Sequence, residues 1–262
     1  MAYPLYQVDA FADAVFEGNP AAVMPLNAPL DEDVMQRLAQ ENNLSETAFL
    51  WPEGDAWRIR WFTPSKEVPL CGHATLASAH VLWRELHWPH DELRFNSASG
   101  ELRVRKVDDL IELNFPALMP KPAELSADVA ERLELKPQDV RSAIKELVVL
   151  ASEAEVAAFS RDFSGCESLE SGVILTARSD RDGVDFVSRF FGGPEVGIKE
   201  DPVTGSAHAI LVPYWAEKLG KSELVGRQIS SRPGQIECVL DGDRVRMRGQ
   251  ARTYLRGFVE WT

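Results

Sequence analysis

The sequence has few cysteines and no long apolar run. Its three cysteines, Cys71, Cys166 and Cys238, are scattered over 262 residues, which excludes a disulfide framework or a cysteine-rich zinc site. No apolar stretch approaches the roughly 20 residues that a membrane-spanning helix needs, and the first residues lack the pattern of a signal peptide. A cytoplasmic protein with no membrane partner is therefore expected.

Basic residues are also outnumbered. The chain carries 28 Lys and Arg against 41 Asp and Glu, a net charge of −13, whereas a nucleic-acid site needs a concentrated basic face. The arginines between Arg244 and Arg256 are typical of the solvated face of a strand, since alternate residues share one side and acidic residues stand beside them. No nucleic-acid partner is expected.

The stretch Cys71-Gly72-His73-Ala74-Thr75 precedes a predicted helix that extends to about Leu86. Small or apolar residues surround the first turns of this helix, a pattern that predicts enclosure by other structure. Gly72 permits close approach of the backbone. The first N–H groups of a helix lack internal partners and carry partial positive charge, so this end can bind an anion.

A similar stretch occurs later in the chain. The order Arg60-Trp61-Phe62, Glu67-Val68, Gly72-His73-Ala74 is echoed by Arg189-Phe190-Phe191, Glu195-Val196, Gly205-Ser206-Ala207, and a second helix then extends to Leu219. This echo predicts a tandem duplication of one α+β unit, with each helix inside its own curved sheet. Prolines 120 and 122 indicate a linker, so the expected halves are residues 1–118 and 119–262, with the last strand allowed to cross back to the first half.

Three residues of the first half are candidates for chemistry. Glu46 stands at the edge of an apolar segment, where partial burial would raise its pKa toward that of a general base; a surface glutamate at a strand end is the alternative. His73 at a helix start should be neutral, or it is a core histidine. Cys71 is a nucleophile activated by the helix, or a buried bystander.

The second half offers Asp201 and Ser206 around its own helix start. Asp201 alone is explained by a turn cap and Ser206 by a helix N-cap, while His208 one turn further on is expected to be structural. Thr204 occupies the place that Cys71 has in the first half, so a pair of thiols, one from each half, is broken. The position that matches Glu46 falls on Glu170 or Ser171.

These residues together resemble a known family, the PhzF-like isomerases, which are related to diaminopimelate epimerase and proline racemase. The matching segments appear in the family's order and span nearly the whole chain. They are Val8-Asp9-Ala10-Phe11 with Gly18-Asn19-Pro20-Ala21-Ala22-Val23, Asn43-Leu44-Ser45-Glu46-Thr47-Ala48-Phe49, Cys71-Gly72-His73-Ala74-Thr75, and Glu200-Asp201-Pro202-Val203-Thr204-Gly205-Ser206-Ala207.

The resemblance implies an α+β fold of two pseudo-symmetric halves, each a β-roll around a central helix, with the active site between them. It also implies that a glutamate replaces the two cysteines of the epimerases. The implied catalytic residues are Glu46, His73 and Asp201, and the implied substrate-binding residues are Gly72, Gly205, Ser206 and Asn19.

The expected function is therefore a biosynthetic isomerase that moves a proton within a small carboxylated metabolite, with no cofactor and no metal. A homodimer is the expected assembly. Two alternatives remain open at this point: a cysteine-dependent amino-acid epimerase that uses Cys71, and a non-catalytic protein that binds a small molecule on the same fold.

Overall fold

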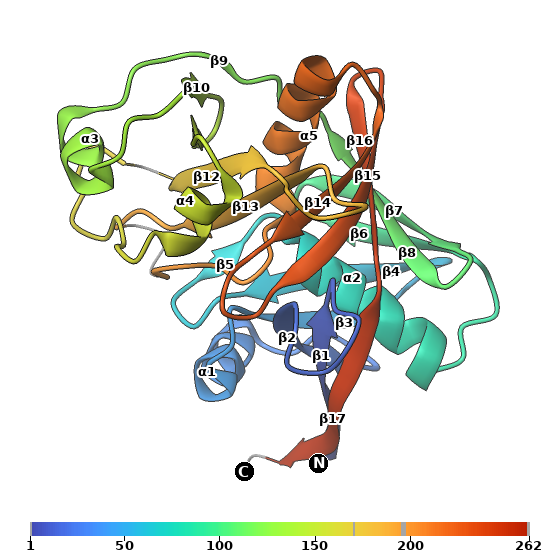
Figure 1. Cartoon of the computed structure of the whole chain (residues 1–262). Coiled ribbons are helices and arrows are strands. Elements are labelled where there is room, and N and C mark those ends of the chain that lie inside the picture. The colour runs from blue at the N-terminus through green and yellow to red at the C-terminus, as the bar shows by residue number, and fades with distance from the viewer. Residues whose placement is uncertain (1, 170, 195–197, 261–262) are drawn as a thin grey trace. The chain divides into compact units, whose positions relative to one another are not determined.

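The computed structural model describes residues 2–169, 171–194 and 198–260 (Figure 1). The chain forms two compact units, unit 1 (Met1–Asn114 with Arg248–Thr262) and unit 2 (Phe115–Met247). The expected halves met at residue 118, and the C-terminal segment belongs to unit 1 because its strand pairs along the first strand of the chain. None of the helices in the described residues is long and apolar enough to span a membrane.

Unit 1 is a curved sheet around one helix. Its strands are β1 (Ala2–Ala10), β2 (Asn19–Pro25), β3 (Glu46–Glu53), β4 (Ala56–Phe62), β5 (Glu67–Val68), β6 (Glu92–Ser97), β7 (Gly100–Val107), most of β8 (Leu110–Pro116), and β17 (Ala251–Glu260). Strand β17 lies antiparallel to β1, and β1 lies antiparallel to β2. Pairing from β2 through β3, β4, β6 and β7 is then parallel, antiparallel, parallel and antiparallel.

Helix α2 (Gly72–His80) is enclosed by this sheet, as the sequence predicts. Every residue from His73 to Ala79 is buried, and the helix contacts β1, β2, β3 and β17. The helical path continues beyond His80 as a π-helical turn, η1 (Val81–Glu85). A further helix, α1 (Glu32–Asn42), packs Met35 against the core that contains Phe49.

Unit 2 repeats this arrangement with different residues. Its strands are β9 (Lys121–Pro122), β10 (Asp139–Ser142), β11 (Glu146–Val149), β12 (Val173–Arg178), β13 (Phe186–Phe191), β14 (Glu223–Gln228), β15 (Gly234–Asp241) and most of β16 (Arg244–Gly249). Pairing from β11 through β12, β13, β14 and β15 is again parallel, antiparallel, parallel and antiparallel.

Helix α5 (Gly205–Leu219) is the buried helix of unit 2. Its residues from Ala207 to Ala216 are all buried, Trp215 stacks on Phe186, and the Trp215 indole N–H donates to Thr176 Oγ1 at 3.0 Å. Two short helices, α3 (Ala127–Leu133) and α4 (Glu153–Ala158), complete the unit. The predicted fold class, α+β with two β-rolls that each surround a helix, is confirmed.

Candidate active site

Two neighbouring strands of unit 1 place polar side chains beside the start of helix α2. Asn19 is the first residue of β2 and Glu46 the first of β3. The two strands are parallel, with Ala21 opposite Glu46, so both side chains stand at the same end of adjacent strands. The sequence analysis assigned both residues to the site, and the structure brings both to the first turn of α2.

The turn before Asn19 requires a glycine. Gly18 has a φ of +65°, and a Cβ there would lie 2.2 Å from the carbonyl oxygen of Ala10, a separation that no side chain tolerates. The preceding loop is held by Asp9, whose Oδ2 accepts the Phe16 N–H at 3.0 Å. The hydrogen bond of Asp9 and the turn at Gly18 thus set the position at which Asn19 begins β2.

Three side chains surround the imidazole of His73. The Nε2 atom lies 3.3 Å from Glu46 Oε2. On the other side of the ring, Nδ1 lies 3.3 Å from Asn19 Nδ2 and 3.5 Å from Cys71 Sγ. An amide nitrogen can only donate, so Nδ1 accepts and the ring proton resides on Nε2, which faces Glu46.

His73 is neutral in this environment. Its side chain is 7% exposed, and burial lowers the pKa of the imidazole to about 3, because the charged form loses its hydration. The partial positive charge at the start of α2 acts in the same direction. Glu46, whose side chain is 18% exposed, therefore faces a neutral N–H donor and not a permanent cation.

Glu46, Cys71 and His73 also form a set of possible metal ligands. One donor atom from each lies within 4.8 Å of the others. However, Glu46 lies nearest to Nε2 of the imidazole while Cys71 contacts Nδ1, so the two residues approach different nitrogens of the ring. The arrangement suits proton transfer better than a three-ligand metal site.

Cys71 is the N-cap residue of α2 and is buried. Its carbonyl oxygen accepts hydrogen bonds from the backbone and side chain of Thr75. The thiol contacts the accepting nitrogen of His73 at 3.5 Å.

Unit 2 has a different polar network at the start of α5. The Thr204 hydroxyl donates to Asp201 Oδ2. Gln228 at the end of β14 donates from Nε2 to the Asp201 carbonyl at 2.7 Å and accepts the Thr204 N–H at 2.9 Å. The network fixes the buried Asp201 beside the helix start.

The other predicted residues of unit 2 have clear positions. Gly205 is the buried first residue of α5, and Ser206 is the exposed second residue. Thr204 holds the N-cap position, so the alternative of Ser206 as N-cap is wrong. His208 donates from Nδ1 to the Thr204 carbonyl at 2.9 Å, and burial lowers its pKa to about 4, consistent with a structural role.

Two polar residues near Asp201 were missed by the sequence analysis. Gln228 is completely buried, and only the tertiary structure brings it to α5. Lys145, between β10 and β11, lies over the Phe190 ring at 4.9 Å; burial lowers the pKa of its ammonium group, and Asp201 opposes this shift. Neither residue belongs to a local sequence motif, so no signal in the sequence pointed to them.

The sequence match between the halves also needs two corrections. Arg60 pairs with Glu67, and Arg189 pairs with Glu200 at 2.6 Å, so Glu200 is the counterpart of Glu67. The proposed counterparts Glu195 and Val196 lie outside the described residues.

The second correction concerns Glu46. Thr47 pairs with Phe62, and Val173 pairs with Phe191, so the counterpart of Glu46 is Gly172 and not Ser171. Glu170, the other proposed match, lies outside the described residues.

The fold of two β-rolls, each around a buried helix, can be compared with known proteins, and the relatives identify the chain as an isomerase. The family model of the phenazine biosynthesis-like protein (PhzC-PhzF) matches residues 8–257. The chain belongs to this family of isomerases, as its motifs predict.

Individual relatives agree with this assignment. An uncharacterized isomerase of Pseudomonas aeruginosa is 48% identical over 98% of both chains. A PhzF-family crystal structure from Enterococcus faecalis is 43% identical, covers 100% of both chains and has a TM-score of 0.95. A probable proline racemase of Agrobacterium radiobacter, 12% identical with a TM-score of 0.64 over 99% of this chain and 93% of its own, shares the fold.

Proposed function

We propose that this protein is a cofactor-independent isomerase that moves a proton within a small carboxylated metabolite, with Glu46 as the acid and base. The observation that carries the proposal is the 3.3 Å approach of the His73 imidazole to the Glu46 carboxylate, at the start of a buried helix. A carboxylate in such a place can accept a proton from carbon, and the neutral ring can orient it without neutralising it.

The proposed reaction begins with the Glu46 carboxylate. It takes a proton from a C–H group of the substrate, and the electron pair of the broken bond delocalises toward the substrate's carboxylate. The first N–H groups of α2, including that of Gly72, stabilise this developing negative charge. Protonated Glu46 then returns the proton to a different carbon of the same molecule, so that no redox partner is needed.

His73 and Asn19 have positioning roles in this scheme. The Asn19 amide donates to Nδ1 and so holds the tautomer whose proton is on Nε2, the nitrogen that lies 3.3 Å from Glu46 Oε2. This local arrangement also explains how a chain with a net charge of −13 attracts an anion, because helix N-termini act over one turn and not over the whole molecule.

Unit 2 contributes a second set of groups to the proposal. We assign Asp201 as a second catalytic carboxylate in addition to Glu46. It is buried at a helix start and is held there by the Thr204 hydroxyl. Gly205 and Ser206 offer first-turn N–H groups of α5 to the substrate's carboxylate. Each helix start provides these groups within its own unit.

The cysteine-dependent epimerase is the competing function. It is favoured by the contact between Cys71 and His73, but such an epimerase needs a second base, and the matching position of unit 2 holds Thr204. A threonine hydroxyl is far less acidic than a thiol and cannot take over that role.

Solvent deuterium exchange tests the assignment. The protein is incubated in deuterated water with a pool of small carboxylated metabolites, and mass spectrometry identifies any compound that acquires deuterium. Glu46→Gln keeps the shape of the side chain and should slow exchange by about 10²–10⁴-fold, in kcat more than in binding. Cys71→Ala should remain within roughly tenfold of the wild type.

The outcomes separate the three functions. Exchange that survives Glu46→Gln but is abolished by Cys71→Ala would establish a cysteine-based epimerase. Absence of exchange into every compound, together with binding of one of them, would establish a non-catalytic binding protein.

A further inference from the structure

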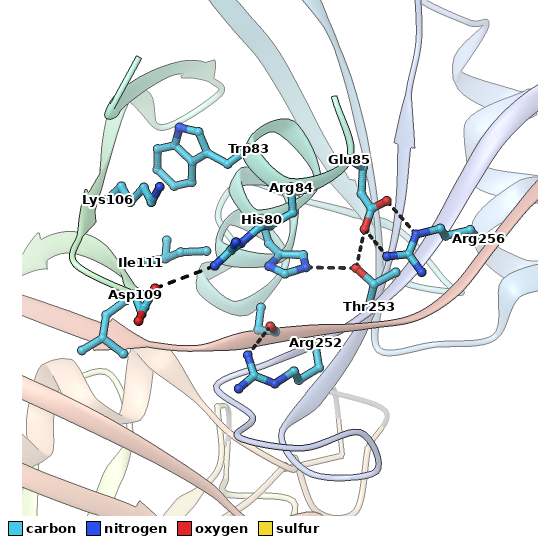
Figure 2. Close-up of a pocket in the computed structure, with 12 residues that line it drawn as sticks. His80, Trp83, Arg84, Glu85, Lys106, Asp109, Ile111, Arg252, Thr253 and Arg256 are labelled. Atoms are coloured by element: carbon cyan, nitrogen blue, oxygen red, sulfur yellow. Dashed lines mark hydrogen bonds and ion pairs between the residues drawn. The ribbon is translucent and has the colours of Figure 1, made fainter. Parts of the chain in front are cut away.

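A cavity lies at the opposite end of the helix that carries His73 (Figure 2). Its volume is about 330 Å³, and its lining residues belong to the end of α2, η1, β7, the turn before β8, β8 itself and β17, all within unit 1. His80, in its wall, follows His73 by seven residues, or about 10 Å along the helix axis. The cavity shares no residue with the cluster around Glu46.

The π-helical turn η1 builds one wall of this cavity. The Leu86 N–H bonds to the Val81 carbonyl at 3.0 Å, an i to i+5 bond that widens the helix. In a regular α-helix with 3.6 residues per turn, Glu85 would lie on a different side from His80. The wider turn brings both to the cavity, and such turns occur frequently at functional sites.

The acidic residues of the cavity are already paired. Glu85 accepts two hydrogen bonds from Arg256, at 2.6 and 2.8 Å, and one from Thr253; the Arg256 bonds lower the pKa of this carboxyl. His80 donates from Nε2 to Thr253 at 2.9 Å. Asp109 lies 3.9 Å from Arg84, and both side chains are mostly exposed, so this pair is weak.

Two cations of the cavity remain uncompensated. Arg252 donates to neutral oxygens of Asp13, Ala251 and Gln250. Lys106 forms no ion pair within the described part of the chain. The cavity is thus locally positive in a protein whose net charge is −13, and an anion would complete it.

The cavity also has an apolar surface. Trp83, Leu110 and Ile111 line it, and Figure 2 shows the indole of Trp83 beside Lys106. The Trp83 N–H donates to the His90 carbonyl at 2.7 Å, which holds the ring in place. A volume of this size matches that of small-molecule sites, which combine apolar walls with a few polar groups.

We propose that this cavity is a second small-molecule site, which binds an organic anion: a carboxylate or phosphate group on a compact apolar body. The anionic group lies between Lys106 and Arg84, whose ion pair with Asp109 is weak enough to be replaced, and the apolar body packs against Trp83 and Ile111. The site is independent of the proposed catalytic cluster.

The indole resonance of Trp83 reports on this cavity alone. The full chain is labelled with ¹⁵N-tryptophan, the Trp83 signal is assigned with Trp83→Phe, and benzoate or phenyl phosphate is titrated. Each anion should shift the signal to saturation, while neutral benzamide should not. The double variant Arg84→Met/Lys106→Met should weaken binding about tenfold or more, because charge-assisted hydrogen bonds are lost.

A matched variant controls for the change in net charge. Arg103→Met/Arg105→Met removes two cations from β7 that pair with Glu101 and Glu92 and do not line the cavity, so affinity should stay within about twofold of the wild type. The relative affinity of the two anions identifies the preferred group. The proposal fails if neither anion shifts the Trp83 signal, if benzamide shifts it equally, or if both double variants bind alike.

Discussion

The residues before helix α2 and before helix α5 form the same ion pair. Arg60 pairs with Glu67, and Arg189 pairs with Glu200; each arginine also lies over a phenylalanine ring two residues later. The helix N-cap follows each glutamate by four residues, Cys71 in one unit and Thr204 in the other. The two units therefore share the arginine–glutamate ion pair before the helix but differ in the residue at the helix N-cap.

The carboxylates show the difference most clearly. Unit 1 has Glu46 at the start of β3, where unit 2 has Gly172. Unit 2 has Asp201 directly after Glu200, where unit 1 has Val68. Each unit thus carries one acidic side chain near its helix start, on a different element. Equivalent scaffolds can therefore supply unequal groups to a reaction, and the following predictions test that asymmetry.

The largest effect is expected from Gly172→Ala. Gly172 has a φ of +116°, and a Cβ there would lie 2.4 Å from the Phe191 carbonyl oxygen. Strain and overlap together should lower the free energy of unfolding by about 3 kcal/mol. Urea denaturation measures this loss, with Gly54→Ala as the control at a φ of +65° with no atom within 4 Å, expected to cost about 1 kcal/mol. Equal losses of unfolding free energy in Gly172→Ala and Gly54→Ala would show that a side chain is tolerated at residue 172.

Asp201→Asn tests whether unit 2 contributes to chemistry. Loss of the carboxylate should slow deuterium exchange by about 10²-fold, at or below the effect of Glu46→Gln. Asp182→Asn, the same charge change at an exposed residue of unit 2, should leave the rate unchanged. An exchange rate in Asp201→Asn equal to that of the control would leave unit 1 as the only source of catalysis.

A drop in pH should destabilise both units, and unit 1 more, because unit 1 holds both His73 and His80, whose pKa burial also lowers to about 4. Burial lowers the pKa of His73 to about 3 and of His208 to about 4 from 6.5, so the unfolded state binds more protons below pH 6.5. The stability is present above pH 6.5 and is lost as pH falls toward the folded-state values, about 2 kcal/mol for each residue at pH 5.

Urea denaturation at pH 7 and pH 5 measures this loss. His73→Asn and His208→Asn should each remove about 2 kcal/mol of the pH dependence. A wild-type difference that stays undiminished in both variants would place the titrating groups elsewhere.

The smallest effect is expected from Cys71→Thr, which gives unit 1 the N-cap residue of unit 2. A hydroxyl can replace the thiol as a donor to Nδ1 of His73, so exchange should stay within roughly tenfold of the wild type, and alkylating reagents should no longer act at this position. Complete loss of exchange would assign Cys71 a chemical role and restore the epimerase alternative.

Much of the fold could be predicted because its signals are local. The small and apolar residues of α2 predict an enclosed helix in any context, and the repeated spacing from an arginine-aromatic strand to a glycine predicts two similar units. The motifs around Asp9, Glu46, Gly72 and Asp201 identify the family in the same way. Each of these patterns is complete within a few residues of sequence.

The tertiary structure alone decided which groups meet. Strand pairing identified Gly172 as the counterpart of Glu46. Packing brought Gln228 to Asp201 and Lys106 to the cavity that Trp83 lines. The tautomer of His73 depends on Asn19, which lies 54 residues away in the chain. The sequence by itself determined which segments form the two central helices and which of their faces are buried, because these features depend on neighbouring residues. The partners of each polar group depend on packing between distant segments, which no local pattern records.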